Sequence, residues 1–519
     1  MSGLWQAFRD AGLLPDPPGD EFCLPAPEWG CDVLDSLLTI WRNRERACQG
    51  AAARSRGRVV RRLEQWQSQG ARLTWGVPDA AVGRAWLGSR LAWWPQGVPS
   101  GRRIGLVSSR LGRDLSQRQP WFAALRTACL HVDARHDHLV TAQSITTQRY
   151  VQRAAQLFGI EVFEIVVGED GRVGSGRRWG HAVLGSGPEQ PVPRPRVSFA
   201  PLPASSQPPD APFLVDLPLA DRAVVALSER LIVLSARPRG NVQRLVDQRL
   251  QEPGFPAASV YLALGPHLVP PDFAQPWMAS GAVGWHLHPP VSEQGDASPA
   301  PWNVARPRTR SAPIRKLPHR QDWSLLTHWT RQQAGPWPDQ SPDDYFDDLI
   351  LDRGGADHSA LAALCRIVRT RRLLATNTLI RGGSRMVCFT EVPLEQLPHL
   401  RAFRSHLSRW DFELYGICID RSWLEQSGGC PVRYGEPDEW HRLPESERPY
   451  FQPRFSRNRG GEPVDWSIER EWRHPGDLSL EQLPADAALV FVPEVGEARK
   501  IATISPWPVI VLPSGTSRY

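Results

Sequence analysis

Between Arg102 and Gly265 the chain alternates two patterns of hydrophobic positions. Short, continuous apolar runs are typical of buried strands. They are separated by segments whose apolar positions recur at i, i+3, i+4 and i+7, which is typical of amphipathic helices. The predicted strands are 102–109, 137–143, 160–167, 230–236 and 258–265, and the predicted helices are 120–132, 151–158, 220–229 and 241–250.

Strands and helices that alternate in this way predict a parallel sheet with right-handed crossovers. We therefore expect a Rossmann-like α/β domain over residues 101–288. The Pro-rich stretch from 188 to 213 interrupts the alternation. Because proline lacks the amide donor that helices and central strands need, we interpret this stretch as an insertion.

Different patterns flank this domain. Residues 1–100 combine helical segments with the Trp-rich stretch WLGSRLAWWPQG, which predicts a mostly helical preface whose tryptophans fill a core. Residues 289–320 are rich in Pro, Ser, Ala and Arg without periodicity, and we interpret them as a linker. Short strands around one helix then predict an α+β domain over residues 321–519.

The charge composition limits the chemistry of the chain. The net charge is +6 and comes almost wholly from arginine, because Lys316 and Lys500 are the only lysines. A phosphate loop that ends in G-K-[ST] is therefore absent, and lysine-dependent catalysis is not expected. A charge of +6 over 519 residues is a weak signal, so we do not expect nucleic acid to be the main partner.

The sequence also predicts no membrane span, no signal peptide and no metal centre. The apolar runs are shorter than the roughly 20 residues that cross a bilayer, and we expect a cytoplasmic protein. The eight cysteines form no C-x-x-C pair, which favours free thiols. We interpret the histidines of HVDARHDH, from 131 to 138, as part of a solvated loop.

Small and polar residues follow three of the predicted strands. These residues are Ser108, Ser109, Arg110 and Gly112 at the end of the first strand and beyond it, Thr141 and Ser144 at the end of the second and beyond it, and Arg239, Gly240 and Asn241 after the fourth. In doubly wound sheets, ligands bind beyond the carboxyl ends of the strands, where backbone amides and helix N-termini face the crevice. The residues are candidate contacts to a nucleotide-type ligand, although such residues also simply cap helices.

The segment from 220 to 265 resembles the Rossmann-like superfamily that includes the DNA processing protein A family and the lysine-decarboxylase-like nucleotide phosphoribohydrolases, grouped as SLOG domains. The resemblance implies a nucleotide-binding domain. The turn from 141 to 147 lacks the family's glycines, and the phosphoribohydrolase Arg-Gly-Glu signature is absent. The resemblance therefore implies a sensor rather than a hydrolase and, as an alternative, a DNA-binding protein of the DNA-processing type.

Four motifs of the C-terminal half resemble the AbiGi-like family, which is associated with abortive infection in phage resistance. They are a C-F-T-E strand, a G-I-C-I-D strand, a V-R-Y strand and a terminal W-S-I-E-R-E-W-R, at residues 388–391, 416–420, 432–434 and 466–473. The resemblance implies a defence effector.

The same order of elements resembles a divergent ADP-ribosyltransferase fold, which implies NAD as the cofactor and His328, Thr390 and Glu471 as the catalytic set. Transfer from NAD passes through an oxocarbenium-like state that a carboxylate stabilises. On a continuous strand Glu469 and Glu471 would share one face and point into one cleft. The alternative is a surface strand whose glutamates pair with arginine, and a lone histidine such as His328 is more often a packing residue.

These observations predict an antiphage protein in which a nucleotide-sensing domain controls an NAD-dependent ADP-ribosyltransferase-like effector. A protein or nucleic-acid acceptor and an oligomeric assembly are compatible with this interpretation. The alternatives are a non-catalytic protein that binds a nucleotide or a partner, and the DNA-binding protein named above.

Overall fold

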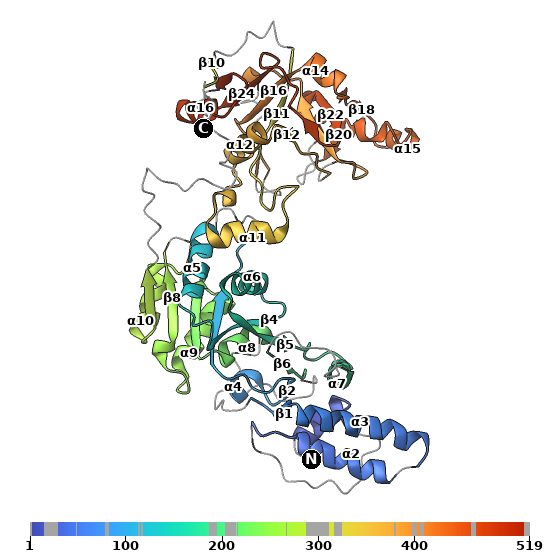
Figure 1. Ribbon diagram of the computed structural model, residues 1–519, viewed down its shortest axis with the longest axis vertical. Coiled ribbons are helices and arrows are strands. Elements are labelled where there is room, and N and C mark those ends of the chain that lie inside the picture. Colours follow the sequence, from blue (N-terminus) through green and yellow to red (C-terminus); the bar gives the residue numbers. More distant parts are fainter. Residues whose placement is uncertain are drawn as a thin grey trace. The chain divides into compact units, whose positions relative to one another are not determined.

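The computed structural model divides the chain into two compact units, which we call the N-terminal unit (1–112, 118–292 and 350–352) and the C-terminal unit (113–117, 293–349 and 353–519). Figure 1 shows the helices and strands of both units. The structure describes residues 3–14, 28, 30–47, 49–77, 83–112, 115, 118–185, 195–202, 214, 216–265, 267–286, 311–315, 324–377, 380–396, 402–404, 409–457 and 463–512.

The N-terminal unit is built on a nine-stranded sheet of order β1-β2-β6-β5-β4-β3-β7-β8-β9. All pairs from β6 to β9 are parallel, and only β1 and β2 pair antiparallel to their neighbours. This topology confirms the predicted Rossmann-like parallel sheet. The strands are β1 (Arg72–Trp75), β2 (Leu91–Trp94), β3 (Arg102–Ser108), β4 (Asp137–Ala142), β5 (Glu161–Val167), β6 (Arg196–Phe199), β7 (Arg230–Ser235), β8 (Val260–Leu264) and β9 (Val283–His286).

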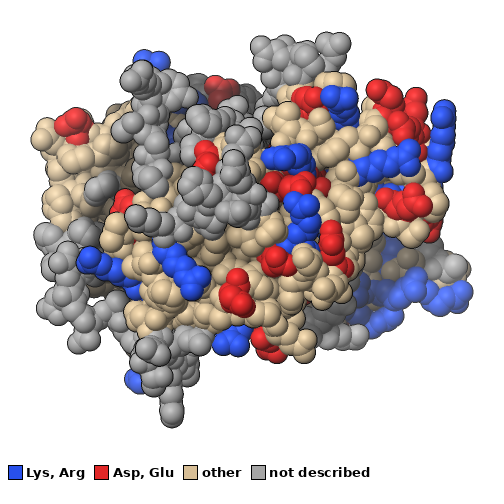
Figure 2. Space-filling model, turned by 90° about the horizontal axis from the view of Figure 1, so that it is seen from above, with Lys and Arg blue, Asp and Glu red and all other residues tan. Residues whose placement is uncertain are grey.

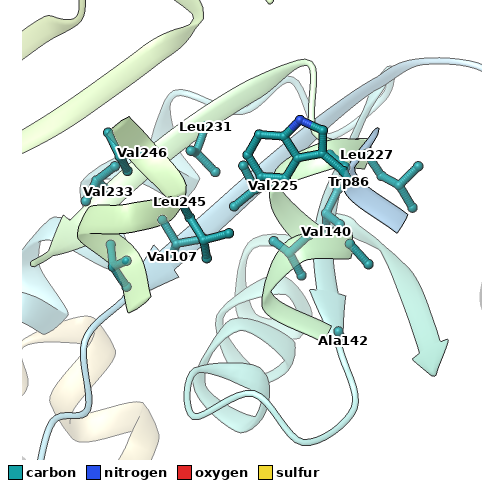
Figure 3. Packing of buried hydrophobic residues seen from close by; sticks show 14 of the residues in the cluster. Trp86, Val107, Val140, Ala142, Val225, Leu227, Leu231, Val233, Leu245 and Val246 are labelled. Atoms are coloured by element: carbon teal, nitrogen blue, oxygen red, sulfur yellow. The ribbon is translucent and has the colours of Figure 1, made fainter. Parts of the chain in front are cut away.

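Helices cover the sheet, and the strands are apolar because they are buried. Figure 3 shows part of this core, in which Val225 and Leu227 belong to the same apolar cluster as Val107 and Val140 of two neighbouring strands. The helices are α4 (Gly83–Leu87), α5 (Gln119–Leu130), α6 (Gln148–Phe158), α7 (Ser175–Gly185), α8 (Leu219–Leu227), α9 (Asn241–Gln251) and α10 (Pro271–Ala279), with the 3-10 turn η3 (Ala257–Ser259).

Two parts of the sheet differ from the sequence prediction. The Pro-rich stretch from 188 to 213 is not a simple insertion, because β6 within it pairs with β5 and β2 inside the sheet. The rest of that stretch lies largely outside the described residues. The prediction of a separate, mostly helical preface also missed two strands, because the first hundred residues supply β1 and β2 to the sheet.

A second core joins the helices of this region to the end of the sheet. Its helices are α1 (Gly3–Asp10), α2 (Leu34–Arg46), α3 (Ala51–Ser68) and α7. Apolar residues of these helices pack with Leu73 of β1 and with Leu91 and Trp93 of β2. The indole of Trp66 lies 4.3 Å from that of Trp93 between ring centroids. The prediction that tryptophans fill a core is confirmed here.

The C-terminal unit contains an eight-stranded sheet of order β10-β25-β24-β16-β11-β13-β22-β17, in agreement with the predicted α+β class. It is antiparallel except at β10-β25 and β24-β25. Its strands are β10 (Ile314–Arg315), β11 (Leu325–Trp329), β13 (Met386–Thr390), β16 (Gly416–Asp420), β17 (Cys430–Pro431), β22 (Glu471–Pro475), β24 (Ala488–Val492) and β25 (Val509–Val511). Most of the predicted linker 289–320 lies outside the described residues, and β10 falls within it.

Two apolar clusters cover the two faces of this sheet. One contains Leu326, Phe389, Ile417 and Trp472 with α12 and α16, and the other contains Trp329, Cys418 and Phe491. The helices are α11 (Pro342–Leu351), α12 (Ala360–Thr370), α14 (Arg421–Gln426), α15 (Glu439–Arg442) and α16 (Val495–Ala502). Small two-stranded sheets pair β12 (Arg372–Leu373) with β23 (Leu478–Ser479), β14 (Ala402–Arg404) with β15 (Arg409–Asp411), β18 (Arg433–Gly435) with β19 (Phe451–Pro453), and β20 (Phe455–Arg457) with β21 (Pro463–Asp465). The 3-10 turns are η6 (Gly354–Ala356), η7 (Leu394–Gln396), η8 (Arg448–Tyr450) and η9 (Trp466–Glu469).

Candidate functional site

The N-terminal unit has a topological switch point between β3 and β7. From β3 the chain proceeds through β4 and β5 to β6 on one side, whereas β7, β8 and β9 extend the sheet on the other side. At such a point the loops after the two central strands diverge and leave a crevice beyond their carboxyl ends, where ligands bind in open α/β sheets. We call this place the β3/β7 edge.

Two serines lie side by side at the β3/β7 edge. The hydroxyl of Ser108 lies 3.0 Å from that of Ser235, at the ends of β3 and β7. The Ser108 oxygen also accepts a hydrogen bond of 2.8 Å from the indole of Trp121, and the amide of Ser109 donates to the carbonyl of Ser235. These bonds fix the start of both loops. Ser235 was not among the candidate ligand contacts predicted from the sequence. Its place at the end of a predicted strand was the only feature that could have identified it.

Three exposed arginines surround this edge. Arg110 follows β3, and Arg237 and Arg239 follow β7. The Arg237 guanidinium donates a 2.6 Å hydrogen bond to the carbonyl of Arg110, so the two loops contact each other. Gly112 has a φ of +88°, which glycine adopts without steric cost. The loops therefore offer positive charge and exposed backbone together.

The N-terminus of α9 also opens at this edge. Gly240 is its N-cap residue, and glycine has no side chain that could accept from the first amides of the helix. Arg239 has a φ of +60°, and its amide donates to the side chain of Gln243 instead. Uncapped amides at a helix N-terminus attract anions through their partial positive charge.

Asp221 is a carboxylate that sequence reasoning missed. It lies in the first turn of α8, which the sequence analysis predicted only as a helix over residues 220–229. Burial raises the pKa of Asp221, and a hydrogen bond with the Asn241 side chain and the charge of Arg110 oppose that rise. The edge thus combines guanidinium groups, helix amides and one partly buried carboxylate.

Thr141 lies near the carboxyl end of β4, the neighbour of β3, and Ser144 follows that strand. Thr141 is fully buried, and its hydroxyl has no hydrogen-bond partner among the described residues. Ser144 is exposed, with a φ of +75°. The structure places both beside the β3 loop along the same edge of the sheet, at the end of the adjacent strand.

In the C-terminal unit, His328, Thr390 and Glu471 lie on three neighbouring strands, β11, β13 and β22. Thr390 stands opposite both Thr327 and Glu471. Residues directly opposite each other in an antiparallel sheet point to the same face, whereas successive residues of one strand alternate. Thr390 and Glu471 therefore share a face, and His328 points to the other one.

The expectation that Glu469 and Glu471 lie on one strand and share its face is wrong. Glu469 ends the 3-10 turn η9, and β22 begins only at Glu471. Arg470 between them has a φ of +45°, in the left-handed region, which breaks the strand alternation. The carbonyl of Glu469 instead accepts a hydrogen bond from the hydroxyl of Thr390.

Glu471 forms an ion pair with Arg473. Its two carboxylate oxygens accept hydrogen bonds of 2.9 Å and 2.8 Å from the guanidinium, whose side chain is only 2% exposed. The same guanidinium donates to the carbonyls of Pro449 and Phe451 and to the side chain of Gln452. The ion pair of the alternative interpretation is therefore present at Glu471, but on a largely buried strand and not on a surface strand.

His328 is held between two strands. Its Nδ1 donates a 2.8 Å hydrogen bond to the carbonyl of Cys388, beside the single residue pair that joins β11 to β13. The ring lies 5.6 Å from that of Phe389 between centroids. Burial lowers the pKa of His328 to about 4, with the bond to Cys388 opposing the change. The imidazole is therefore neutral at pH 7, and the partly buried ring packs against Phe389.

We expect His328 to make the C-terminal unit sensitive to acid. Because its pKa falls from 6.5 to about 4 on folding, the unfolded chain binds the proton more tightly. The free energy of unfolding is therefore unaffected by His328 above pH 6.5. It decreases as the pH falls towards 4, by about 3 kcal/mol at most. Urea unfolding of the full chain at several pH values measures this effect. His328→Asn keeps a donor for the Cys388 carbonyl but cannot titrate, so its stability should depend less on pH; an unchanged pH dependence would contradict the assignment.

Among the described residues, no cluster of three or more His, Cys, Asp or Glu side chains is placed to hold a metal ion. His136 forms an ion pair with Asp133, and His138 contacts the carbonyl of Ser100. No helix in the described part of the chain is long and apolar enough to cross a membrane.

Neither a family model nor a curated protein matches this chain. Among solved structures it is similar to the X-ray structure of DNA processing protein A (DprA) from Streptococcus pneumoniae, with 13% sequence identity and a TM-score of 0.24. That match covers 49% of this chain and 83% of the other. Because a likeness at this TM-score carries no argument, the fold assignment rests on the sheet topology. None of the comparisons supports the expected resemblance of the C-terminal half to the AbiGi-like family.

Proposed function

We propose that the N-terminal unit binds a nucleotide at the β3/β7 edge. The observation that carries this proposal is the convergence of Arg110, Arg237 and the uncapped N-terminus of α9 beyond the ends of the two central strands. Guanidinium groups and helix amides together bind phosphate by charge and by directed hydrogen bonds.

Asp221 supports a nucleotide over a simple phosphate ion as the ligand. A carboxylate repels phosphate but accepts hydrogen bonds from ribose hydroxyls or from the amino group of a base. Its contact with Asn241 places this acceptor beside the helix amides that would hold the phosphate. A ligand that carries both a phosphate and a ribose uses both sets of groups.

A thermal-shift series on the full chain tests this function. A ligand that binds only the folded state at a hundred times its Kd stabilises that state by about 2.7 kcal/mol. We expect nucleoside phosphates, cyclic dinucleotides or ADP-ribose to raise Tm by several degrees, and inorganic phosphate to raise it less. The double variant Arg110→Gln/Arg239→Gln should lose the shift.

The matched control is Arg135→Gln, which removes an exposed arginine that precedes β4, at the opposite edge of the same sheet. It should keep the full shift. The proposal fails if no nucleotide raises Tm, or if the double variant responds like the wild-type chain.

We propose NAD-dependent ADP-ribosyl transfer by the C-terminal unit as a second candidate function. The observation that favours it is the pairing of Thr390 with Glu471 on one face of adjacent strands. A carboxylate held rigidly beside a hydroxyl suits the stabilisation of positive charge that develops on a ribose. His328 is not part of this pair, because it points to the other face.

Control of this activity by the nucleotide-binding unit, and a role in phage defence, are extensions of the same proposal. They are supported by the order of the two units in the chain and by the AbiGi-like motifs. A non-catalytic C-terminal unit that binds a partner is the competing interpretation, and the Glu471–Arg473 ion pair supports it.

A further inference from the structure

The positive charge of the chain is concentrated in one pair of helices. α2 and α3 carry eight arginines and no lysine against three carboxylates, which gives this pair a net charge of +5. The whole chain has a net charge of +6, so all other residues together contribute only +1. On the face of the molecule shown in Figure 2, by comparison, acidic and basic side chains are interspersed.

The three carboxylates of this pair are engaged between the two helices. Asp35 of α2 accepts a hydrogen bond from the side chain of Gln67 of α3. Glu64 of α3 accepts a 2.6 Å bond from Arg42 of α2. The carboxylate of Glu45 packs against the backbone of α3. Two of the three are therefore hydrogen-bonded between the helices, and the third lies at Gly57, near the guanidinium of Arg61.

The outer side of α3 is lined by Arg54, Arg58 and Arg61. Their spacing of i, i+4 and i+7 places them on one face of the helix, and all three are exposed. The row is about 10 Å long at 1.5 Å per residue. None of these arginines forms an ion pair with a residue that the structure describes. Gln65 continues the row as a polar residue.

We propose that this row, which we call the α3 face, binds the phosphate backbone of a nucleic acid. Duplex DNA carries one negative charge per about 1.7 Å of its axis, so a face of this length meets several phosphates at once. The guanidinium fork matches the geometry of phosphate oxygens. Contacts to backbone phosphates do not depend on the base sequence, so we expect the α3 face to bind DNA without sequence preference.

The composition of the α3 face favours nucleic acid over an anionic membrane. A helix that lies on a membrane inserts aromatic or aliphatic side chains beside its basic residues. The exposed positions of α3 among its described side chains hold only Arg, Ser and Gln, as at Ser55 and Gln65. A flat polar row binds a charged backbone without such an anchor.

The α3 face is distinct from the nucleotide-binding edge proposed above. α2 and α3 pack on β1 and β2, which form one end of the nine-stranded sheet, whereas β3 and β7 are separated from them by β6, β5 and β4. Nucleic-acid binding at α3 therefore does not depend on a nucleotide at the β3/β7 edge, and either proposal can fail alone.

The experiment compares two triple variants of the full chain in a fluorescence titration of a labelled, mixed-sequence DNA duplex. Arg54→Gln/Arg58→Gln/Arg61→Gln removes the α3 face. The control, Arg315→Gln/Arg442→Gln/Arg499→Gln, removes three exposed arginines of the C-terminal unit and therefore lowers the net charge equally. Thermal melting checks that both variants fold.

Three phosphate contacts give a slope of about −2.7 in log K against log salt, which is about a forty-fold loss of affinity between roughly 50 and 200 mM salt. We expect the α3 variant to lose this slope of about −2.7 and to bind DNA about forty-fold more weakly at low salt. The control variant should bind like the wild-type chain. The proposal is overturned if the wild-type chain does not bind DNA at low salt, if both triple variants weaken equally, or if vesicles of anionic lipid bind the wild-type chain and DNA does not.

Discussion

Replacing Arg473 by methionine is expected to lower the free energy of unfolding of the C-terminal unit by about 3 to 5 kcal/mol. The Arg473 side chain is 2% exposed and donates to both oxygens of Glu471, to two backbone carbonyls and to Gln452. Methionine fills much of the space but leaves the carboxylate without its charge partner and the carbonyls without donors. Unpaired buried groups of this kind carry the full cost of lost hydration.

Urea unfolding of the full chain, followed by circular dichroism, measures this loss. The matched control is Arg433→Met, which breaks another arginine–glutamate ion pair of the same unit. Arg433 pairs with Glu439 at 3.0 Å, but its side chain is 61% exposed. Exposed ion pairs contribute about 0 to 1 kcal/mol, so the control should be nearly neutral. Equal losses in the two variants would show that Arg473 is not the anchor that its contacts indicate.

The parallel sheet of the N-terminal unit was predictable because its signal is local. Buried strands such as β7 and β8 contain continuous apolar runs, and the helices between the strands repeat with the helical period. β6 escaped prediction because the prolines around it indicate a loop, while its four residues, Arg196–Phe199, contain none. Its place in the sheet comes from pairing with β2 and β5, distant strands that local periodicity does not identify.

The candidate sites were also only partly predictable, because contacts between distant residues leave no local pattern in the sequence. The segments at the β3/β7 edge could be selected because parallel strands end at a common edge, but the contact of Asp221 with Asn241 joins residues that no local pattern connects. In the C-terminal unit the strand of Thr390 was identified correctly. The register that sets Thr390 opposite Thr327, rather than His328, decides which face each side chain occupies, and register depends on tertiary pairing.

The break at Arg470 had no signal in the sequence. Left-handed backbone is usually marked by Gly or Asn, whereas here arginine adopts a φ of +45° between two glutamates. Local sequence therefore favoured a continuous E-R-E strand. The structure separates the two carboxylates, so Glu469 cannot act through a shared strand face with Glu471, and it becomes a control residue for tests of the transferase proposal.

If the C-terminal unit transfers ADP-ribose from NAD, Glu471→Gln is expected to lower the rate of NAD consumption about a thousandfold. Glutamine keeps the shape of glutamate but removes the negative charge. An oxocarbenium-like transition state therefore loses electrostatic stabilisation on the order of 4 kcal/mol. The measurement is NAD turnover per folded molecule, with nucleotide ligands present and absent, because Glu471→Gln also breaks the ion pair with Arg473 and reduces the folded fraction.

Two further variants separate catalysis from folding. Arg473→Gln breaks the same ion pair but keeps the carboxylate, so under the transferase proposal it destabilises the unit at least as much as Glu471→Gln and yet keeps more activity per folded molecule. Glu469→Gln removes the carboxylate of the 3-10 turn and should leave turnover within a few fold of the wild-type rate. If Glu471→Gln and Arg473→Gln lose stability together and turnover per folded molecule stays unchanged in both, the ion pair is structural and the transferase proposal is wrong. Absence of NAD consumption by the wild-type chain at every nucleotide tested would also refute it and would favour a C-terminal unit that binds a partner without catalysis.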